Sequence, residues 1–413
     1  MKQTIAIVGK TFSSYTSLID RNRYKLIYLK DSSTNKSRKN NIFDLVIELD
    51  YSNRESLTKS LQSINLDFKI DVLVSIYENY VLPKAIIGEI LGISALSIES
   101  AKLASNKYLM RRAFNEYDKS ISPKFFKVDN LESLKKNLKG FSYPVMIKPA
   151  SLVKSLLIEK CDDYSMTVSK YKEISKKIKS VYQKYNTFVE PEIIVEEYME
   201  GSMHTVACFS DKDGNVIAHP EVVDNVTARD IDIEDSYLYK RSIPSSLSKN
   251  LQQELIKTAI KGMKALDLKS SPGHIELFLT ENGPKIIEIG ARIGGYRNLM
   301  YLNSSGTDMV QAEIDSTLSS NLKFNQVNFN NFVSAIELFP NKIANFIYIK
   351  NIRKLNKLDS LKSLSIHAKK GDKVGKASEG FKSCCNILLV NEDKQQLELD
   401  EKFIKDYVKV ITN

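Results

Sequence analysis

Two glutamates, Glu276 and Glu288, lie in apolar runs that a short turn-forming segment separates. The runs are 274–280 and 285–289, and the four residues Glu281-Asn-Gly-Pro between them are typical of a connection between antiparallel strands. If the loop of this hairpin holds an odd number of residues, three or five, the strand register sets Glu276 opposite Glu288. Opposed side chains have Cβ atoms roughly 4.5–5.5 Å apart, so two carboxylates there need a proton or a cation between them.

The cation that suits this pair is Mg²⁺, with Mn²⁺ as a substitute, because a hard ion is held by one or two carboxylates plus substrate phosphates. Side-chain alternation puts Gly290 and Arg292 on the face of Glu288, where a guanidinium can hold a phosphate group bidentately. Gly294 and Gly295 let the backbone approach closely. The alternative interpretation is a solvated outer face of a two-stranded ribbon, on which Glu and Arg are ordinary surface residues.

The composition predicts a globular protein of two or three domains. The chain has 413 residues, of which 42% are hydrophobic and 27% charged, without long low-complexity tracts. Neither a leader sequence nor an apolar stretch of membrane-spanning length is recognisable, so we expect a cytoplasmic protein without a membrane partner. The four cysteines show no metal-binding or disulfide spacing, which favours buried thiols.

The excess of 60 Lys and Arg over 50 Asp and Glu favours anionic ligands but does not by itself imply nucleic acid. The densest basic stretch, 172–184, carries apolar residues at helical spacing. We therefore interpret its lysines as one solvated helix face, with nucleic-acid binding as the alternative.

The first hundred residues have the pattern of an open parallel α/β sheet. A strand is predicted at Thr4–Val8, ending in Gly9, as in the first turn of a nucleotide-type domain, although the full glycine fingerprint is absent. Further strands are expected at 25–29, 45–49 and 72–76, followed by a helix at 83–91 that ends at Gly92.

The rest of the chain alternates between helices and strands. A basic amphipathic helix is predicted at 105–115, strands at 144–148 and 193–195 on either side of the lysine-rich helix, and a hairpin from 205–209 and 216–218. The polar segment from Asp224 to Pro244 shows no clear periodicity, which indicates a long functional loop. Beyond residue 330 a smaller α+β segment is expected.

Four features in this order resemble the ATP-grasp superfamily: Lys107, the strand Val145-Met-Ile-Lys148, the segment Ile194-Val-Glu-Glu-Tyr-Met-Glu-Gly201, and the hairpin with Glu276, Glu288 and Arg292. Residues 71–112 look like the beginning of its carboxylate–amine ligase branch, which includes L-amino-acid (dipeptide) ligases. The resemblance covers most of 1–320 and implies a mixed α/β and α+β architecture. Its parts would be a parallel α/β domain at 1–104, a small lobe at 105–200, a large lobe with the metal site at 201–329, and an α+β extension at 330–413.

The resemblance also implies roles for individual residues. Lys107 and Lys148 would hold ATP phosphates as point charges, with a strand-end lysine reaching solvent as the alternative for Lys148. Arg292 would be the catalytic side chain, bridging the γ-phosphate and an acyl phosphate. The adenine and ribose contacts are expected from Glu196, Glu197, the backbone of Tyr198 and Met199, and His204, although Glu197 also reads as an acidic strand end and His204 as a structural histidine.

Two departures from the family pattern concern the phosphate and metal sites. The loop after Lys148 lacks the glycines of the usual phosphate lid, so Ser151, Lys154 and Ser155 are expected to contact phosphate through their side chains. Gly290 stands where many relatives have an asparagine metal ligand.

The resemblance implies an ATP-dependent ligase that activates a carboxylate as an acyl phosphate and joins it to an amine, releasing ADP. Amino acids are the expected substrates, and an assembly of identical subunits is left open. The following side chains are candidates for binding a substrate carboxylate: Arg229, Tyr237, Tyr239, Lys240 and Arg297. The alternatives are a carboxylase or purine-type ligase that uses bicarbonate, a catalytically silent nucleotide-binding protein, and a nucleic-acid binder.

Overall fold

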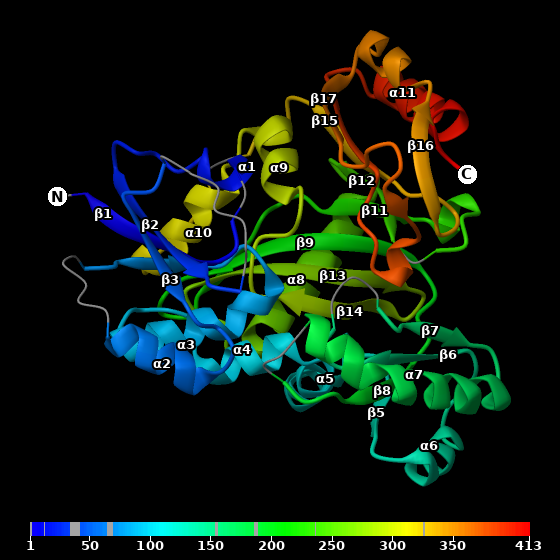
Figure 1. Cartoon of the computed structure of the whole chain (residues 1–413), viewed down its shortest axis with the longest axis horizontal. Helices are drawn as coiled ribbons and strands as arrows, with labels where there is room; N and C mark the ends of the chain where they lie inside the picture. The colour runs from blue at the N-terminus through cyan, green and yellow to red at the C-terminus, as the bar shows by residue number, and fades with distance from the viewer. Residues whose placement is uncertain are drawn as a thin grey trace.

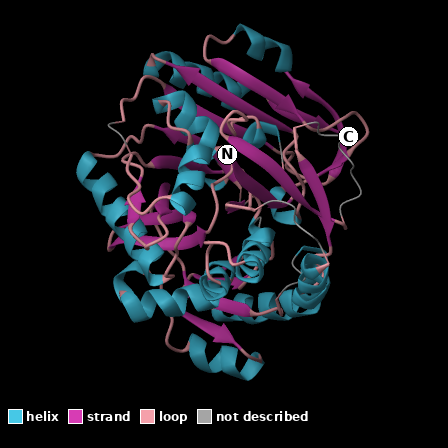
Figure 2. Ribbon diagram, turned by 90° about the vertical axis from the view of Figure 1, so that its left-hand side faces the viewer, coloured by secondary structure: helices cyan, strands magenta, loops and turns pink. Residues whose placement is uncertain are grey.

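The computed structural model describes residues 2–11, 13–33, 42–63, 69–152, 156–185, 189–235, 237–324 and 327–413. Four sheets organise this part of the chain: a parallel N-terminal sheet, an antiparallel sheet in a small lobe, a nine-stranded sheet, and a three-stranded sheet near the C-terminus. Figure 1 shows the N-terminal unit (blue) beside the large sheet, with the small lobe below it and the C-terminal unit (orange to red) above. In Figure 2 helices lie on the outer sides of the strands in the lower half of the view. The α/β and α+β fold class is confirmed.

The N-terminal unit is the predicted parallel sheet, with strand order β3-β2-β1-β4. Its apolar strands are buried between helices, as all-parallel sheets require. Gly92 ends α3 in the left-handed conformation, as the sequence predicts. The elements are β1 (Gln3–Gly9), α1 (Ser13–Thr16), β2 (Tyr24–Asp31), β3 (Leu45–Leu49), α2 (Arg54–Gln62), β4 (Val72–Val74), η1 (Glu78–Tyr80), α3 (Val81–Leu91) and α4 (Ile98–Ser105).

Gly9, at the end of β1, is covered by a tyrosine ring. Its φ is +86°, and a Cβ at this position would lie 2.2 Å from the Tyr80 ring. The Tyr80 hydroxyl donates to Asp31 at the end of the neighbouring strand β2. The glycine turn that looks like part of a nucleotide-binding loop in the sequence is therefore filled by a side chain of the protein itself.

The small lobe is a four-stranded antiparallel sheet of order β5-β8-β6-β7, with helices α6 and α7 packed on one face. Strand alternation directs Ile147 and Val195 toward these helices, and Lys148 and Glu196 toward the opposite face. Its elements, with the helix that leads into it, are α5 (Lys107–Tyr117), η2 (Lys119–Ile121), β5 (Phe125–Val128), α6 (Leu131–Leu138), β6 (Val145–Pro149), β7 (Glu159–Cys161), α7 (Tyr164–Tyr185) and β8 (Ile193–Glu197).

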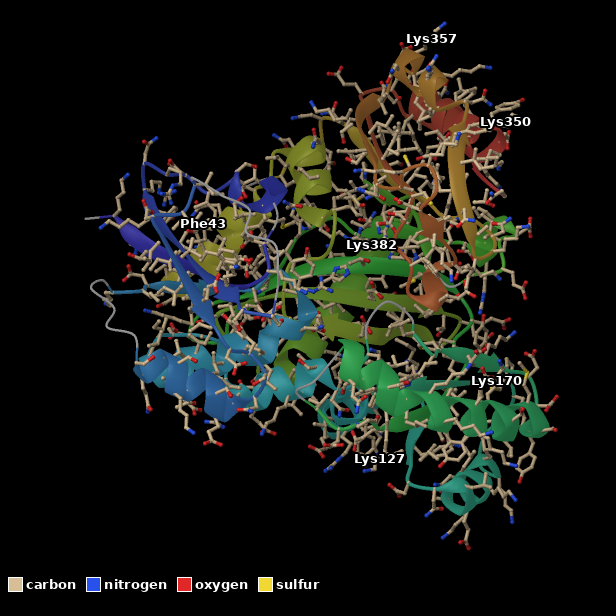
Figure 3. The ribbon with its side chains drawn as sticks, in the orientation of Figure 1. Phe43, Lys127, Lys170, Lys350, Lys357 and Lys382 are labelled. Atoms are coloured by element: carbon tan, nitrogen blue, oxygen red, sulfur yellow. The ribbon has the colours of Figure 1, made fainter. Side chains whose placement is uncertain are left out.

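Helix α7 contains the lysine-rich stretch, and its lysines point to solvent on one face. Ile174, Ile178 and Tyr182 are buried against the sheet, whereas the lysines from 172 to 179 are exposed. Lys170, labelled in Figure 3, lies on the same helix with its ammonium 3.2 Å from Glu159. The interpretation of this stretch as a solvated helix face is confirmed.

The nine-stranded sheet joins the large lobe to the C-terminal unit, in the order β14-β13-β9-β11-β12-β15-β19-β17, with β10 paired to β9. Helix α8 packs on one face of β9, β13 and β14 through a continuous apolar core. The strands are β9 (Ser202–Ser210), β10 (Val216–Ala218), β11 (Val223–Thr227), β12 (Leu238–Ile243), β13 (Ser271–Thr280), β14 (Gly283–Gly290), β15 (Phe332–Leu338), β17 (Leu361–Ile366) and β19 (Cys385–Asn391). The helices of this region are η3 (Arg229–Ile231), α8 (Lys249–Ala265), α9 (Arg297–Ser305) and α10 (Met309–Leu318).

The prediction of a long loop from Asp224 to Pro244 was wrong. Strands β11 and β12 occupy the two ends of this segment and pair with each other, and η3 lies in the connection between them. The strands carry polar side chains on both faces: Lys240 bonds Glu401 on one side, and Arg241 bonds Glu337 on the other. Because both faces contact protein, the apolar alternation that identifies a half-buried strand is missing from the sequence.

The C-terminal unit has the expected α+β composition, but its strands β15, β19 and β17 continue the large sheet across the predicted boundary at 329/330. A second sheet of order β18-β16-β20 covers one side. Its remaining elements are β16 (Ala344–Lys350), η4 (Ile352–Lys357), β18 (Lys373–Val374), η5 (Ala377–Glu379), α11 (Lys394–Tyr407) and β20 (Lys409–Thr412). Within the described ranges, no helix is both long and apolar enough to span a bilayer.

The covered glycine gives a stability test. We expect Gly9→Ala to lower the free energy of unfolding by about 3 kcal/mol, because a left-handed backbone strain is added to a clash with the Tyr80 ring. Gly371→Ala is the matched control: Gly371 has a φ of +90° with nothing within 4 Å of its Cβ position, so only the strain, about 1 kcal/mol, remains. Urea denaturation measures both. Equal losses in the two variants would contradict the clash.

Candidate active site between the lobes

Glu276 on β13 and Glu288 on β14 are directly opposed, as predicted from strand alternation. The reason differs from the predicted one. The loop holds two residues, Glu281 and Asn282, and not three or five, since Thr280 pairs with Gly283. The register shifts between Glu276 and Leu277, where a bulge at Ile287 adds one residue to β14 and restores the opposition.

Each of the two carboxylates has a basic neighbour. Glu288 lies 2.7 Å from the Lys107 ammonium, and Glu276 lies 3.3 Å from the His274 Nε2. Burial opposes ionisation of Glu288, but the Lys107 charge outweighs it and lowers the pKa of Glu288 to about 2. Glu288 therefore faces Glu276 as an ionised carboxylate, an arrangement that a cation bound between them would stabilise.

Across the cleft, a buried glutamate of the small lobe is shared by two cations. Glu196 on β8 is 1% exposed, and its two oxygens accept from the Arg111 Nε at 2.9 Å and the Lys148 Nζ at 2.6 Å. Burial lowers the pKa of Lys148 to about 8, although the Glu196 carboxylate opposes this shift. The sequence suggested Lys148 and Glu196 as separate ligand contacts, and the structure brings them together.

Arg111 links the two lobes and was not singled out in the sequence as a site residue. It lies on α5 with no exposed surface, and besides Glu196 it donates to the carbonyl of Ile287. Ile287 is the bulged residue of β14, so the irregularity that opposes the two glutamates also provides an acceptor for the small lobe. The sequence showed only that Arg111 lies on a basic helix. Its role could not be predicted, because its partners Glu196 and Ile287 lie far away in the sequence.

Arg292 follows β14 and is held by a carboxylate from the N-terminal unit. Its Nε lies 2.9 Å from Glu78, which follows β4 at the carboxyl edge of the parallel sheet, where α/β ligand sites are built. A Cβ at Gly290 would be 2.9 Å from the Glu78 carboxylate, so this glycine makes room for Glu78. Desolvation raises the pKa of Glu78, and the Arg292 charge offsets this increase only in part. Sequence analysis missed Glu78, whose only signal is this position after a parallel strand.

Some of these groups line a narrow cavity of about 40 Å³. Its lining includes Glu78, Lys107, Ser151, Leu152, Glu288 and Gly290, which come from the N-terminal unit, the small lobe and the hairpin. The described part of the chain contains no group of three or more His, Cys, Asp or Glu side chains that could hold a metal ion alone. Two opposed carboxylates fit a Mg²⁺ ion that takes its other ligands from phosphate and water.

Comparison with known proteins identifies this arrangement. The family model of the ATP-grasp domain matches residues 141–300, which include Lys148, Glu196 and the hairpin with both glutamates. Residues 141–300 of the chain are therefore similar to an ATP-grasp domain. The solved structure of an L-amino acid ligase from Bacillus licheniformis covers 100% of this chain and 99% of its own, with a TM-score of 0.81 at 16% identity.

Two curated relatives are ligases. Alanine–anticapsin ligase of Bacillus subtilis (strain 168) is 25% identical over 275 residues, which cover 63% of this chain and 57% of the relative. A phosphoribosylamine–glycine ligase of Methanobrevibacter smithii is 27% identical over 250 residues, which cover 57% of this chain and 56% of the relative. These similarities lie in the carboxylate–amine ligase branch, and the chain spans less than two thirds of the length of either relative.

The segment expected to contact a nucleotide base lies at the end of β8 and directly after it. The Tyr198 amide donates to the Pro144 carbonyl at 3.3 Å, and the Glu197 amide to the Lys124 carbonyl at 2.9 Å. Among the described residues the Met199 amide has no hydrogen-bond partner. Both ring nitrogens of His204 are engaged, Nδ1 by Asp224 at 3.0 Å and Nε2 by Ser202 at 2.7 Å. Lys154 and Ser155 lie outside the described residues.

The expected substrate-binding side chains are not gathered in the cleft. Arg297 is 2% exposed and donates to Thr205 and Asn225, on the face of the sheet that also carries Glu276. Lys240 points the other way and lies 2.5 Å from Glu401. Arg229 is exposed on η3, and Tyr237 and Tyr239 are buried in the C-terminal core.

The interlobe arginine gives a second test. Arg111→Met should lower the free energy of unfolding by about 3 kcal/mol or more, because Glu196 loses one of its two cations while remaining buried. Arg112→Met is a matched control on the same helix: Arg112 pairs with Glu116 at 3.6 Å in solvent, where the loss should stay within about 0.5 kcal/mol. Urea denaturation compares them, and similar losses would refute the interlobe role.

Proposed function

We propose that this protein is an ATP-dependent ligase that activates a carboxylate as an acyl phosphate and joins it to an amine, releasing ADP and phosphate. The observation that supports this most directly is the convergence in one cleft of two opposed carboxylates, Glu276 and Glu288, with Lys107, Lys148 and Arg292. Such a set neutralises and orients phosphate groups, which is most of what phosphoryl transfer requires of a protein.

The reaction has two displacements. A carboxylate oxygen of the first substrate attacks the γ-phosphorus of ATP. The bond between this phosphorus and the oxygen that bridges the β- and γ-phosphates breaks, and ADP leaves. The nitrogen of an amine then attacks the acyl carbon, loses a proton and expels phosphate. No side-chain nucleophile takes part, so the protein contributes position and charge.

Each residue of the cleft has a task in this scheme. Lys107 and Lys148 hold phosphate oxygens, and Arg292 stabilises the charge that develops during transfer. Glu276 and Glu288 would hold Mg²⁺, or Mn²⁺ in its place, which neutralises phosphate charge when bound. On the base side, the Met199 amide offers a donor to the adenine ring, and Glu196, whose oxygens also accept from Arg111 and Lys148, would take its amino group.

The substrates proposed are two amino acids, or an amino acid and another small carboxylate. The L-amino acid ligase fold and the similarity to alanine–anticapsin ligase support this choice. A second candidate is a purine-type ligase, which the similarity to phosphoribosylamine–glycine ligase favours. Against it, the Tyr80 ring covers Gly9 at the end of β1, where the backbone would otherwise be open to a phosphate group.

Nucleotide product analysis tests the reaction. Protein incubated with Mg-ATP and pooled amino acids should release ADP and phosphate only when the joined pair is present. Glu288→Gln should lower kcat about 10²- to 10³-fold, since it removes one ligand of the proposed metal. The control, Glu281→Gln, changes an exposed glutamate in the loop of the same hairpin and should leave kcat unchanged. Release of AMP and pyrophosphate would reject the acyl-phosphate scheme.

The pH dependence of nucleotide affinity tests the role of Lys148. Because burial lowers its pKa to about 8, Lys148 carries its charge below pH 8 and loses it above. ADP affinity should be constant below pH 8 and fall up to about tenfold per pH unit above it, since binding must then take up a proton. Calorimetry with ADP measures this. Adenosine, which has no phosphates, is the control, and a parallel fall in its affinity would exclude Lys148 as the cause.

A further inference from the structure

A cavity of about 760 Å³ lies in the C-terminal unit and shares no lining residue with the cleft cavity. Three parts of the chain line it: residues 231–233 and 237–239 before and at the start of β12, the turn 338–342 after β15, and residues 405–412. Figure 1 shows this unit on the opposite side of β9 and β13 from the small lobe. We propose that this cavity is a second ligand site, which binds a small organic anion with an aromatic body.

The walls of the cavity are aromatic and branched aliphatic. Tyr237 and Tyr239 are 7% and 5% exposed, and the ring centroid of Phe339 lies 4.4 Å from that of Tyr237. Leu338 and Val408 are also buried at its edge. Rings packed in this way are held rigid, and the small part of their surface that reaches the cavity offers an apolar contact to a planar ligand at little further cost in conformational entropy.

The rim of the cavity is basic. Lys342, Lys405 and Lys409 are exposed, and Asp406 is the acid among the lining residues. Among the described residues, none of these lysines forms an ion pair, and the Lys409 ammonium donates to the Lys405 carbonyl. Apolar walls below unpaired ammonium groups select a molecule with a ring system at one end and an acid group at the other.

The size of the cavity agrees with this class of ligand. Small-molecule sites have volumes of about 300–1,000 Å³, and a two-ring body with one acid group fits within that range. Tyr237 and Tyr239, which the sequence analysis assigned to substrate binding, are part of these walls. Both rings pack in the C-terminal core, away from Glu276 and Glu288, so a ligand that they contact would be separate from the substrates of the cleft.

The probe for this site is 8-anilinonaphthalene-1-sulfonate, an aromatic anion whose fluorescence rises in an apolar environment. It should bind the intact protein, and saturating Mg-ADP should not displace it. The neutral analogue N-phenyl-1-naphthylamine has nearly the same rings without the sulfonate and should bind more weakly. Displacement of the probe by Mg-ADP, or no fluorescence change in the wild type, would overturn the proposal.

A charge-reversed pair localises the probe. The double variant Lys342→Glu, Lys405→Glu changes two exposed rim residues and should lower probe affinity about tenfold. The double variant Lys357→Glu, Lys382→Glu has the same net charge, and its two residues, labelled in Figure 3, are exposed in the same unit but do not line the cavity. Its affinity should stay within about twofold of the wild type. Equal losses in the two double variants would overturn the site.

Discussion

The cleft depends on one buried carboxylate, that of Glu196, which Arg111 and Lys148 share. A charge taken out of water must be compensated where it lies, so Glu196 fixes both cations at once. Because Arg111 also bonds the bulged backbone of β14, this compensation fixes the small lobe against the hairpin that carries Glu276 and Glu288. The position of the small lobe in the cleft therefore depends on the charge of a single buried side chain.

The other cationic side chains of the cleft are also compensated by carboxylates. Lys107 is paired with Glu288, and Arg292 with Glu78. Phosphate groups that enter must compete with these carboxylates, which keep the lysine and arginine side chains ordered in the absence of substrate. A divalent cation at Glu288 would release Lys107 from its partner, so that metal and phosphate can bind as one unit.

The sequence allowed the fold and the opposed carboxylates of the β13–β14 hairpin to be predicted because both rest on local patterns. The apolar runs of β1, β2 and β3 and the C-cap at Gly92 are signals of this kind. The facing of Glu276 and Glu288 follows from strand alternation, although the loop length expected for it was wrong. Arg111 and Glu78 could not be predicted, because their partners come from other units of the chain and no local period marks such a pairing. Strands β11 and β12 could not be predicted for a related reason: their polar side chains contact other parts of the protein on both faces of the sheet, so no apolar alternation marks them.

The bulge at Ile287 lies between the carboxylate pair of the hairpin and the loop at its tip. The register of Glu276 and Glu288 is set on the strand side of the bulge, whereas the loop at Glu281 and Asn282 lies beyond it, in solvent. Changes in loop length need not propagate to the carboxylate pair, since the fixed point is the carbonyl that Arg111 holds. The tip is thus a natural place to graft a reporter dye or an affinity peptide, which would sense the cleft without disturbing it.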